Sequence, residues 1–183
     1  LNTDCFSSLA DEEDYEESLK LPDGFTLLCQ NIESRDPDIK SAVRYCKSRG
    51  MTARDLWFFK VGTCKSGRYR RKVIFPSFSE DGLLNYYVAR SIDDVQRKYS
   101  NADVKKTEII FNEINIDWAK ELTLVEGPFD AIKCDTNTTC ILGSDLNIGS
   151  RLFTKIAKNK TRVLLALDSD MKEKTQSISK LLY

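Results

Sequence analysis

The chain of 183 residues contains no histidine, and its six cysteines include no Cys-x-x-Cys pair. Because a structural zinc site needs closely spaced ligands, we expect no zinc in this chain. The absence of histidine also excludes Ser–His and Cys–His nucleophilic catalysis. Cys46, Cys134 and Cys140 lie in apolar stretches, so they are predicted to be buried, reduced, cytosolic thiols.

Long apolar runs and a recognisable signal peptide are also missing. No run approaches the ~20 residues that a membrane span needs. We therefore expect a cytoplasmic protein with no membrane partner. A hydrophobic content of 41% is normal for a globular protein, and the length suits one or two domains with a real core.

The formal net charge is zero, but charge is distributed unevenly. Residues 1–20 carry seven acidic side chains and one basic, whereas residues 60–106 carry eleven basic and five acidic, a net of +6. Residues 1–24 are predicted to be a solvated acidic linker or tail, with a DNA-mimicking, autoinhibitory role as the alternative. The basic segment indicates a polyanionic partner, because excess charge of one sign costs self-repulsion.

Aromatic residues are interleaved with these basic ones. They are Tyr69, Phe75, Tyr86, Tyr87 and Tyr99. Such rings could stack on the bases of a single-stranded template. The alternation within Val73–Phe78 favours the core for Phe75 and Phe78.

Two short apolar runs end in carboxylates. Leu122–Val125 is followed by Glu126, and the run from Val163 is followed by Asp168 and Asp170. Uninterrupted apolar runs predict strands buried on both faces of a parallel sheet, where ligands bind beyond the carboxyl ends. Successive strand residues alternate between faces, so Asp168 and Asp170 are expected to project on the same side, where both can reach one metal cluster. Three carboxylates at one edge would repel each other unless Mg²⁺ or Mn²⁺ bound them.

The segment between the two runs predicts a βαβαβ unit. Pro128 suits a first helical position, ahead of a short helix over 129–135. A strand over 138–142 and a helix with Asn147 as its N-cap follow, and a last helix begins near Lys172.

The upstream half predicts a small α+β unit. Ser41–Arg49 is expected to be a helix ending at Gly50, and Thr52 is a candidate cap for a second helix to Phe58. The predicted strands are 70–78 and 84–90, which pair as a hairpin, and 109–111.

Several of these residues carry a family resemblance. Glu126-Gly127, Asp130, Gly143 and Asp168-Ser-Asp170 resemble the TOPRIM domain of DnaG-type primases, topoisomerases and some nucleases. Upstream segments resemble primase motifs in the same order. These are Ala42–Met51, Arg71–Gly82, Ala89-Arg90 and Lys98–Asn101. The chain therefore resembles the RNA-polymerase core of bacterial and phage DnaG-type primases from about Leu21 to Tyr183.

The resemblance implies an α/β fold. A TOPRIM-type parallel sheet with flanking helices over 119–183, truncated here, would follow an α+β subdomain over 25–118 that binds template and nucleotide. The implied activity is template-directed synthesis of short RNA primers on single-stranded DNA by metal-dependent nucleotidyl transfer. The implied partners are single-stranded DNA, ribonucleoside triphosphates and a replicative helicase, in the host cytoplasm if a bacteriophage encodes the chain.

The resemblance also assigns residues. The implied catalytic residues and ligands of Mg²⁺ or Mn²⁺ are Glu126, Asp168 and Asp170, with Asp130 as a supporting ligand. The implied nucleotide- or template-binding residues are Arg71, Lys72, Arg90, Lys98 and Asn101. The alternatives are a TOPRIM nuclease or topoisomerase fragment, and a non-catalytic module that binds single-stranded DNA.

The sequence departs from the family at two places. Asn112 and Glu113 follow Phe111, where the family usually has a lysine, and Met171-Lys172 follows the aspartate pair in place of Ala-Gly. These departures favour a phage or otherwise divergent enzyme. The start at Leu1, without the family's zinc ribbon, is expected of an excised fragment.

Overall fold

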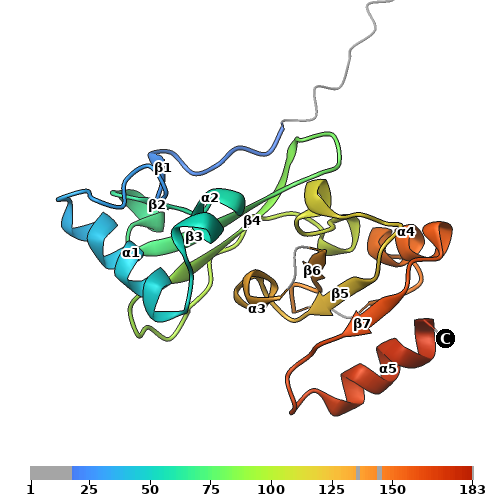
Figure 1. Ribbon diagram of the computed structural model, residues 1–183. Helices are drawn as coiled ribbons and strands as arrows, with labels where there is room; N and C mark the ends of the chain where they lie inside the picture. Colours follow the sequence, from blue (N-terminus) through green and yellow to red (C-terminus); the bar gives the residue numbers. More distant parts are fainter. Residues whose placement is uncertain (1–17, 135–136, 144–145, 183) are drawn as a thin grey trace, which may run out of the picture.

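The computed structural model describes residues 18–134, 137–143 and 146–182, which build two β-sheets placed side by side (Figure 1). The first sheet is antiparallel with the order β1-β2-β3-β4. Its strands are β1 (Phe25–Leu27), β2 (Gly62–Cys64), β3 (Lys72–Phe78) and β4 (Leu84–Ser91). Most of the predicted acidic tail lies outside the described residues.

The second sheet is parallel, with the order β6-β5-β7. Its strands are β5 (Leu122–Val125), β6 (Thr138–Cys140) and β7 (Val163–Leu165). Because β5 pairs with both neighbours, the predicted βαβαβ unit is confirmed, and so is the α/β fold class.

Five α-helices flank the sheets in the described part of the chain (Figure 1). They are α1 (Pro37–Ser48), α2 (Ala53–Phe58), α3 (Pro128–Lys133), α4 (Arg151–Asn159) and α5 (Lys172–Leu182). The predicted cap of α2 is confirmed, since Thr52 and Asp55 form a reciprocal capping box. The described connections between strands also contain three short 3₁₀ helices, at Gly67–Tyr69, Lys106–Glu108 and Glu113–Asn115. No described helix is long and apolar enough to cross a membrane.

Three local predictions were wrong. Residues 109–111 are not a strand: Ile110 and Phe111 are buried, but they lie between two 3₁₀ helices. Helix α4 is capped by Ser150, whose Oγ accepts a hydrogen bond from the backbone of Phe153, and not by Asn147. Strand β7 ends at Leu165 and is an edge strand, with Leu164 51% exposed, so it is not buried on both faces.

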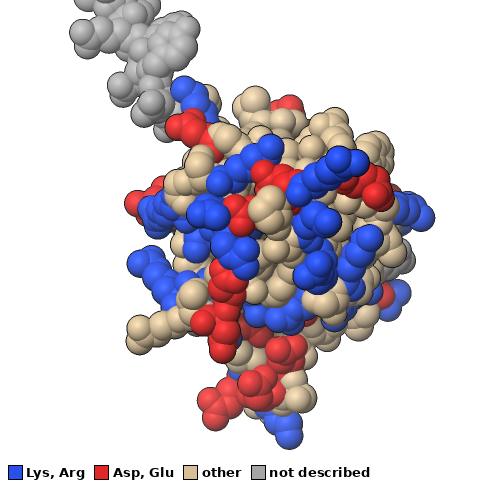
Figure 2. Space-filling view, turned by 90° about the vertical axis from the view of Figure 1, so that its left-hand side faces the viewer, with Lys and Arg blue, Asp and Glu red and all other residues tan. Residues whose placement is uncertain are grey.

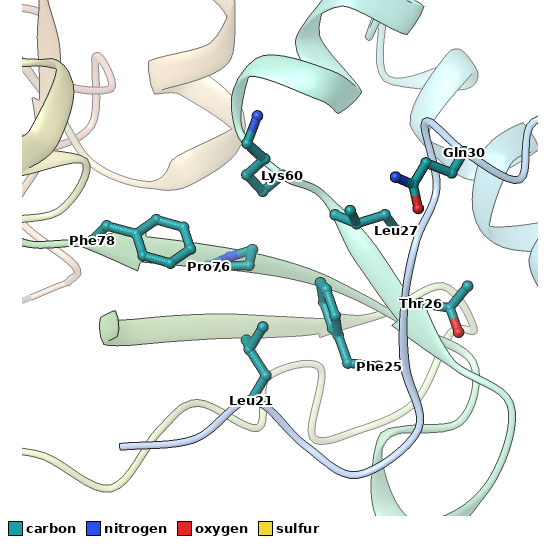
Figure 3. A pocket seen from close by; sticks show the side chains of 8 residues that line it. All are labelled: Leu21, Phe25, Thr26, Leu27, Gln30, Lys60, Pro76 and Phe78. Carbon is teal, nitrogen blue, oxygen red and sulfur yellow. The ribbon is translucent and has the colours of Figure 1, made fainter. Parts of the chain in front are cut away.

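The two faces of the antiparallel sheet have different surroundings. Phe75 is fully buried, as predicted, and its ring lies 4.7 Å from the ring of Phe129 in α3. Because successive strand residues alternate, Pro76 and Phe78 point to the opposite face. On that face an open groove of about 520 Å³ runs between the sheet and Lys60 (Figure 3). Contact with the parallel sheet is therefore made through the Phe75 face.

Candidate active site

A cavity of about 540 Å³ is lined by residues of both sheets and their helices. Its acidic residues are Glu126, Asp130 and Asp168, and its basic residues are Arg49, Arg90 and Lys106. Asn101, Tyr99 and Phe129 also line it. Carboxylates, cations and an amide from six separate places in the sequence thus share one cavity.

The acidic residues come from the parallel sheet and the connections that follow its strands. Glu126 directly follows β5, and Asp130 lies in the first turn of α3, which begins at Pro128 as predicted. Asp168 lies beyond β7, and its carbonyl accepts a hydrogen bond of 2.9 Å from the backbone N–H of Met171. The carboxyl ends of β5 and β7 therefore supply acidic side chains to one cavity.

Asp168 and Asp170 are placed by a turn and not by a strand. Strand β7 ends three residues before Asp168, so the alternation expected to bring both aspartates to one side does not apply. Asp168 lines the cavity, whereas Asp170 is absent from its lining. The two aspartates thus have different surroundings.

The suitability of the cavity for a metal depends on its carboxylates, since the sequence has no histidine. Within the described ranges, no three acidic or cysteine side chains are arranged as a group that could hold a metal ion. Mg²⁺ commonly binds through one or two carboxylates and completes its shell with water and substrate phosphates. The residues present fit Mg²⁺ or Mn²⁺ in that manner, as part of a complex with substrate.

The basic wall of the cavity is built around the ring of Phe129. The guanidinium carbons of Arg49 and Arg90 lie 5.6 and 5.3 Å from the centre of this ring. Arg90 also donates a hydrogen bond of 2.6 Å to the Tyr99 hydroxyl. Among the residues that the structure describes, neither arginine has a carboxylate partner, and the buried Nε of Arg90 has no hydrogen-bond acceptor. Both guanidinium groups are therefore available to an anion.

Sequence reasoning did not single out Arg49 or Lys106. Arg49 is the C-cap residue of α1 and was interpreted only as the end of a helix, although it lies within the Ala42–Met51 motif. Lys106 donates a hydrogen bond of 3.0 Å to the carbonyl of Leu142, across 36 residues of sequence. The net charge of residues 60–106 was the only available signal for Lys106.

The other predicted nucleotide- or template-binding residues are divided between different places. Asn101 lines the main cavity with Arg90. Lys98 forms an ion pair with Asp94 at 3.3 Å and lines an adjacent cavity of about 150 Å³, which also includes Arg49 and Arg90. Lys72 begins β3, and neither it nor Arg71 lines either cavity.

Arg71 is occupied by carboxylates. It donates to both oxygens of Asp93, at 2.7 and 2.6 Å, and to Asp38 at 3.3 Å. The hydrogen bond from Arg71 lowers the pKa of Asp93, and hydrogen bonds from Arg70 and Arg71 lower that of Asp38. Figure 2 views the molecule from the left-hand side of Figure 1. On that face, Lys and Arg side chains are spread widely, with Asp and Glu side chains interleaved among them.

Most of the interleaved aromatic rings belong to the core. Phe75, Tyr86 and Tyr87 are buried, and the hydroxyl of Tyr87 lies 2.8 Å from that of Tyr69. Tyr99 is 43% exposed and is the ring of this segment that lines the cavity. The ring of Tyr99 is therefore accessible for stacking on a base.

No protein-family model and no curated protein matches the sequence. Solved structures do match. A structure of the DnaG primase catalytic domain bound to single-stranded DNA is 16% identical, with a TM-score of 0.65 over 84% of this chain and 66% of that one. The zinc-binding and RNA polymerase domains of Aquifex aeolicus primase are 20% identical, with a TM-score of 0.66 over 85% of this chain and 50% of that one.

The RNA polymerase domain of Mycobacterium tuberculosis primase DnaG is 15% identical, with a TM-score of 0.65 over 85% of this chain and 72% of that one. The chain thus has the fold of a primase catalytic core. More particularly, the resemblance to DnaG-type primases is confirmed at the level of the fold. The chain spans only two thirds and one half of the first two of these structures.

Proposed function

We propose that this chain is the catalytic core of a DNA primase, which joins ribonucleoside triphosphates on a single-stranded DNA template. The observation that supports this most is the cavity itself, where Glu126 and Asp168 share one space with Arg49 and Arg90. Phosphoryl chemistry needs cations to neutralise the triphosphate and carboxylates to hold a divalent metal. Similarity in fold to a DnaG catalytic domain bound to single-stranded DNA supports the same proposal.

In the proposed reaction, the 3′-hydroxyl of one nucleotide attacks the α-phosphorus of the next. A phosphodiester bond forms, the bond to the β-phosphate oxygen breaks, and pyrophosphate leaves. Arg49 and Lys106 neutralise the triphosphate and the developing charge of the leaving group, and Arg90 contacts a phosphate of the template or of the nucleotide. Glu126 serves either as the group that accepts the proton of the attacking hydroxyl or as a metal ligand.

Glu126 and Asp168 are the proposed holders of Mg²⁺ or Mn²⁺, with Asp130 supporting them from α3 and Asp170, two residues after Asp168, as a further proposed ligand. When bound, the metal would activate the attacking hydroxyl and neutralise phosphate charge. Asn101 positions the nucleotide, and Tyr99 offers a ring for a base to stack on. Lys98, in the adjacent cavity, contacts a phosphate of the template or the nucleotide.

The template is proposed to pass the basic wall of the cavity, at Arg49 and Arg90, and Lys98 of the adjacent cavity. We further propose a cytoplasmic location and a replicative helicase as partner, because the proposed primase activity implies both. A bacteriophage origin stays a prediction. The division at residues 24 and 118 into an acidic tail, an α+β subdomain and a TOPRIM domain also stays a prediction.

One assay separates the three candidate activities. The protein is incubated with labelled single-stranded DNA, labelled ribonucleoside triphosphates and Mg²⁺, and both nucleic acids are followed. Metal-dependent appearance of dinucleotides and longer RNA supports a primase. Shortening of the DNA without RNA synthesis would identify a nuclease, and retention of DNA without either product would identify a binding module.

A further inference from the structure

A carboxylate that takes no part in the cavity is buried at the junction of the two sheets. The side chain of Glu113 is only 1% exposed. Both of its oxygens accept hydrogen bonds from Nη2 of Arg151 in α4, at 3.1 and 3.2 Å. Nζ of Lys155, one turn further along α4, lies 3.8 Å away. A buried charge is tolerated only when it is paired in this way.

The same cations hold the hairpin of the antiparallel sheet. Glu80, in the turn between β3 and β4, accepts two hydrogen bonds from Lys155, at 2.7 and 2.6 Å, and lies 3.7 Å from Arg151. The hydrogen bond from Lys155 lowers the pKa of Glu80. Two carboxylates and two cations thus join the tip of one sheet to a helix of the other. We call Glu80, Glu113, Arg151 and Lys155 the clasp.

The chain around Glu113 is bonded to both sheets. The backbone N–H of Asn112 donates to Ser77 of β3 at 3.0 Å, and Asn85 of β4 donates to the carbonyl of Ile110 at 3.2 Å. On the other side, Thr139 of β6 donates to the carbonyl of Phe111 at 2.6 Å. Asn112 itself has a left-handed backbone, with φ of 59°. Residues 110–115 are therefore a bonded junction between the sheets.

We propose that Glu113 is a positioning residue, which acts through Arg151 and Lys155 to hold the two sheets at the separation that forms the cavity. One wall of that cavity, with Arg90 and Asn101, belongs to the antiparallel sheet and its connections, and the other, with Glu126 and Asp168, to the parallel sheet. Whatever fixes the sheets relative to each other fixes these walls. The catalytic consequence rests on the proposed function, whereas the mechanical role does not.

The kinetic consequence of loosening the clasp differs from that of partial unfolding. If the walls fluctuate, only a fraction of the molecules is competent to bind, and the apparent dissociation constant rises as the inverse of that fraction. Saturating nucleotide draws the protein back into the competent state, so KM rises and kcat is retained. Unfolding of some molecules lowers kcat and leaves KM unchanged.

The test uses Glu113→Gln and the milder Arg151→Gln, since Arg151 is 41% exposed and Lys155 remains beside Glu113 after its loss. Matched controls are Glu108→Gln and Arg162→Gln, which break the exposed pairs with Lys105 and Glu121. Amide hydrogen exchange should accelerate at Asn112 and in the hairpin turn by about tenfold or more, as loss of a charged hydrogen bond predicts. Exchange there should match wild type in both controls.

Steady-state synthesis on the same proteins completes the test. KM for the nucleotide should rise about tenfold in the clasp variants, with kcat within about twofold of wild type. If amide hydrogen exchange is unchanged in both clasp variants, the clasp does not hold the two sheets together. If exchange is faster but KM for the nucleotide is unchanged, Glu113 is not a positioning residue for the cavity. If wild type makes no RNA, the proposed function fails, and hydrogen exchange alone decides whether the clasp joins the sheets.

Discussion

Arginine residues in this chain are of two kinds, distinguished by their partners. Arg71 has its donors taken up by Asp38 and Asp93. Arg90 has a tyrosine hydroxyl as its partner and a buried Nε without an acceptor in the described structure. A guanidinium whose N–H groups already donate to carboxylates has few donors left for a phosphate. Arg71 and Arg90 therefore have different roles, although both lie in the basic segment of the sequence.

This difference predicts the salt dependence of binding to single-stranded DNA. Arg90→Gln should flatten the slope of log affinity against log salt by about 0.7, the value of one phosphate contact. Arg71→Gln should leave that slope unchanged, because its charge is balanced within the protein. Fluorescence anisotropy with labelled DNA over a range of salt concentrations measures both. Equal flattening by the two variants would show that the ion pairs of Arg71 open on binding.

Arg49 is predicted to contact the triphosphate. It is exposed, lines both neighbouring cavities and has no carboxylate partner among the described residues. Arg49→Ala should raise KM for the nucleotide by about tenfold or more, since a charge-assisted hydrogen bond contributes roughly 1.5–3 kcal/mol. Lys47→Ala, a nearby exposed cation of α1 outside both cavities, is the control. An Arg49→Ala enzyme with the KM of wild type would remove Arg49 from the proposed site.

At the level of elements, the ion pairs of Asp38 hold α1 to the start of β3. Arg70 donates to Asp38 at 2.7 Å and Arg71 at 3.3 Å, and these bonds lower the pKa of Asp38 from its ordinary 3.8. A carboxyl with a lowered pKa in the folded state stabilises the fold above its unfolded pKa. That contribution is lost as the pH falls through the folded value.

The free energy of unfolding should therefore fall as the pH drops below about 3.8. Asp38→Asn should lower stability at pH 7 and make the change between pH 5 and pH 2 smaller. Urea unfolding followed by circular dichroism at several pH values measures this. A variant whose pH dependence equals that of wild type would mean that other carboxyls govern acid unfolding.

Elements with strong local signals could be predicted from the sequence. Thr52 with Asp55 and Pro128 at the start of α3 each act within a few residues, so sequence spacing was sufficient. The segment Ile109–Phe111 has a strand-like composition but is fixed by bonds to both sheets, which sequence cannot show. Strand β7 was predicted too long, because the run from Val163 to Asp170 continues as a turn.

For the whole molecule, the candidate site depends on the meeting of the two sheets. The carboxylates of the cavity follow strands of the parallel sheet, so their approach was predictable from the rule for strand ends. The cations were harder to predict, because Arg49 ends α1 and Lys106 lies in a 3₁₀ helix, far from the carboxylates in sequence. Their place in the cavity follows from packing such as that of Phe75 against Phe129.

The central claim is that this cavity synthesises RNA, and Asp168 is the residue that tests it most directly. Asp168 lines the cavity and is exposed, so Asp168→Asn should change the free energy of unfolding by no more than about 0.5 kcal/mol, as expected of a surface substitution. Synthesis of labelled dinucleotide should fall by about 10²–10³-fold, while DNA binding is kept. Asp170→Asn should cost less, because Asp170 does not line the cavity. A folded Asp168→Asn protein that makes dinucleotide at the wild-type rate would contradict the account.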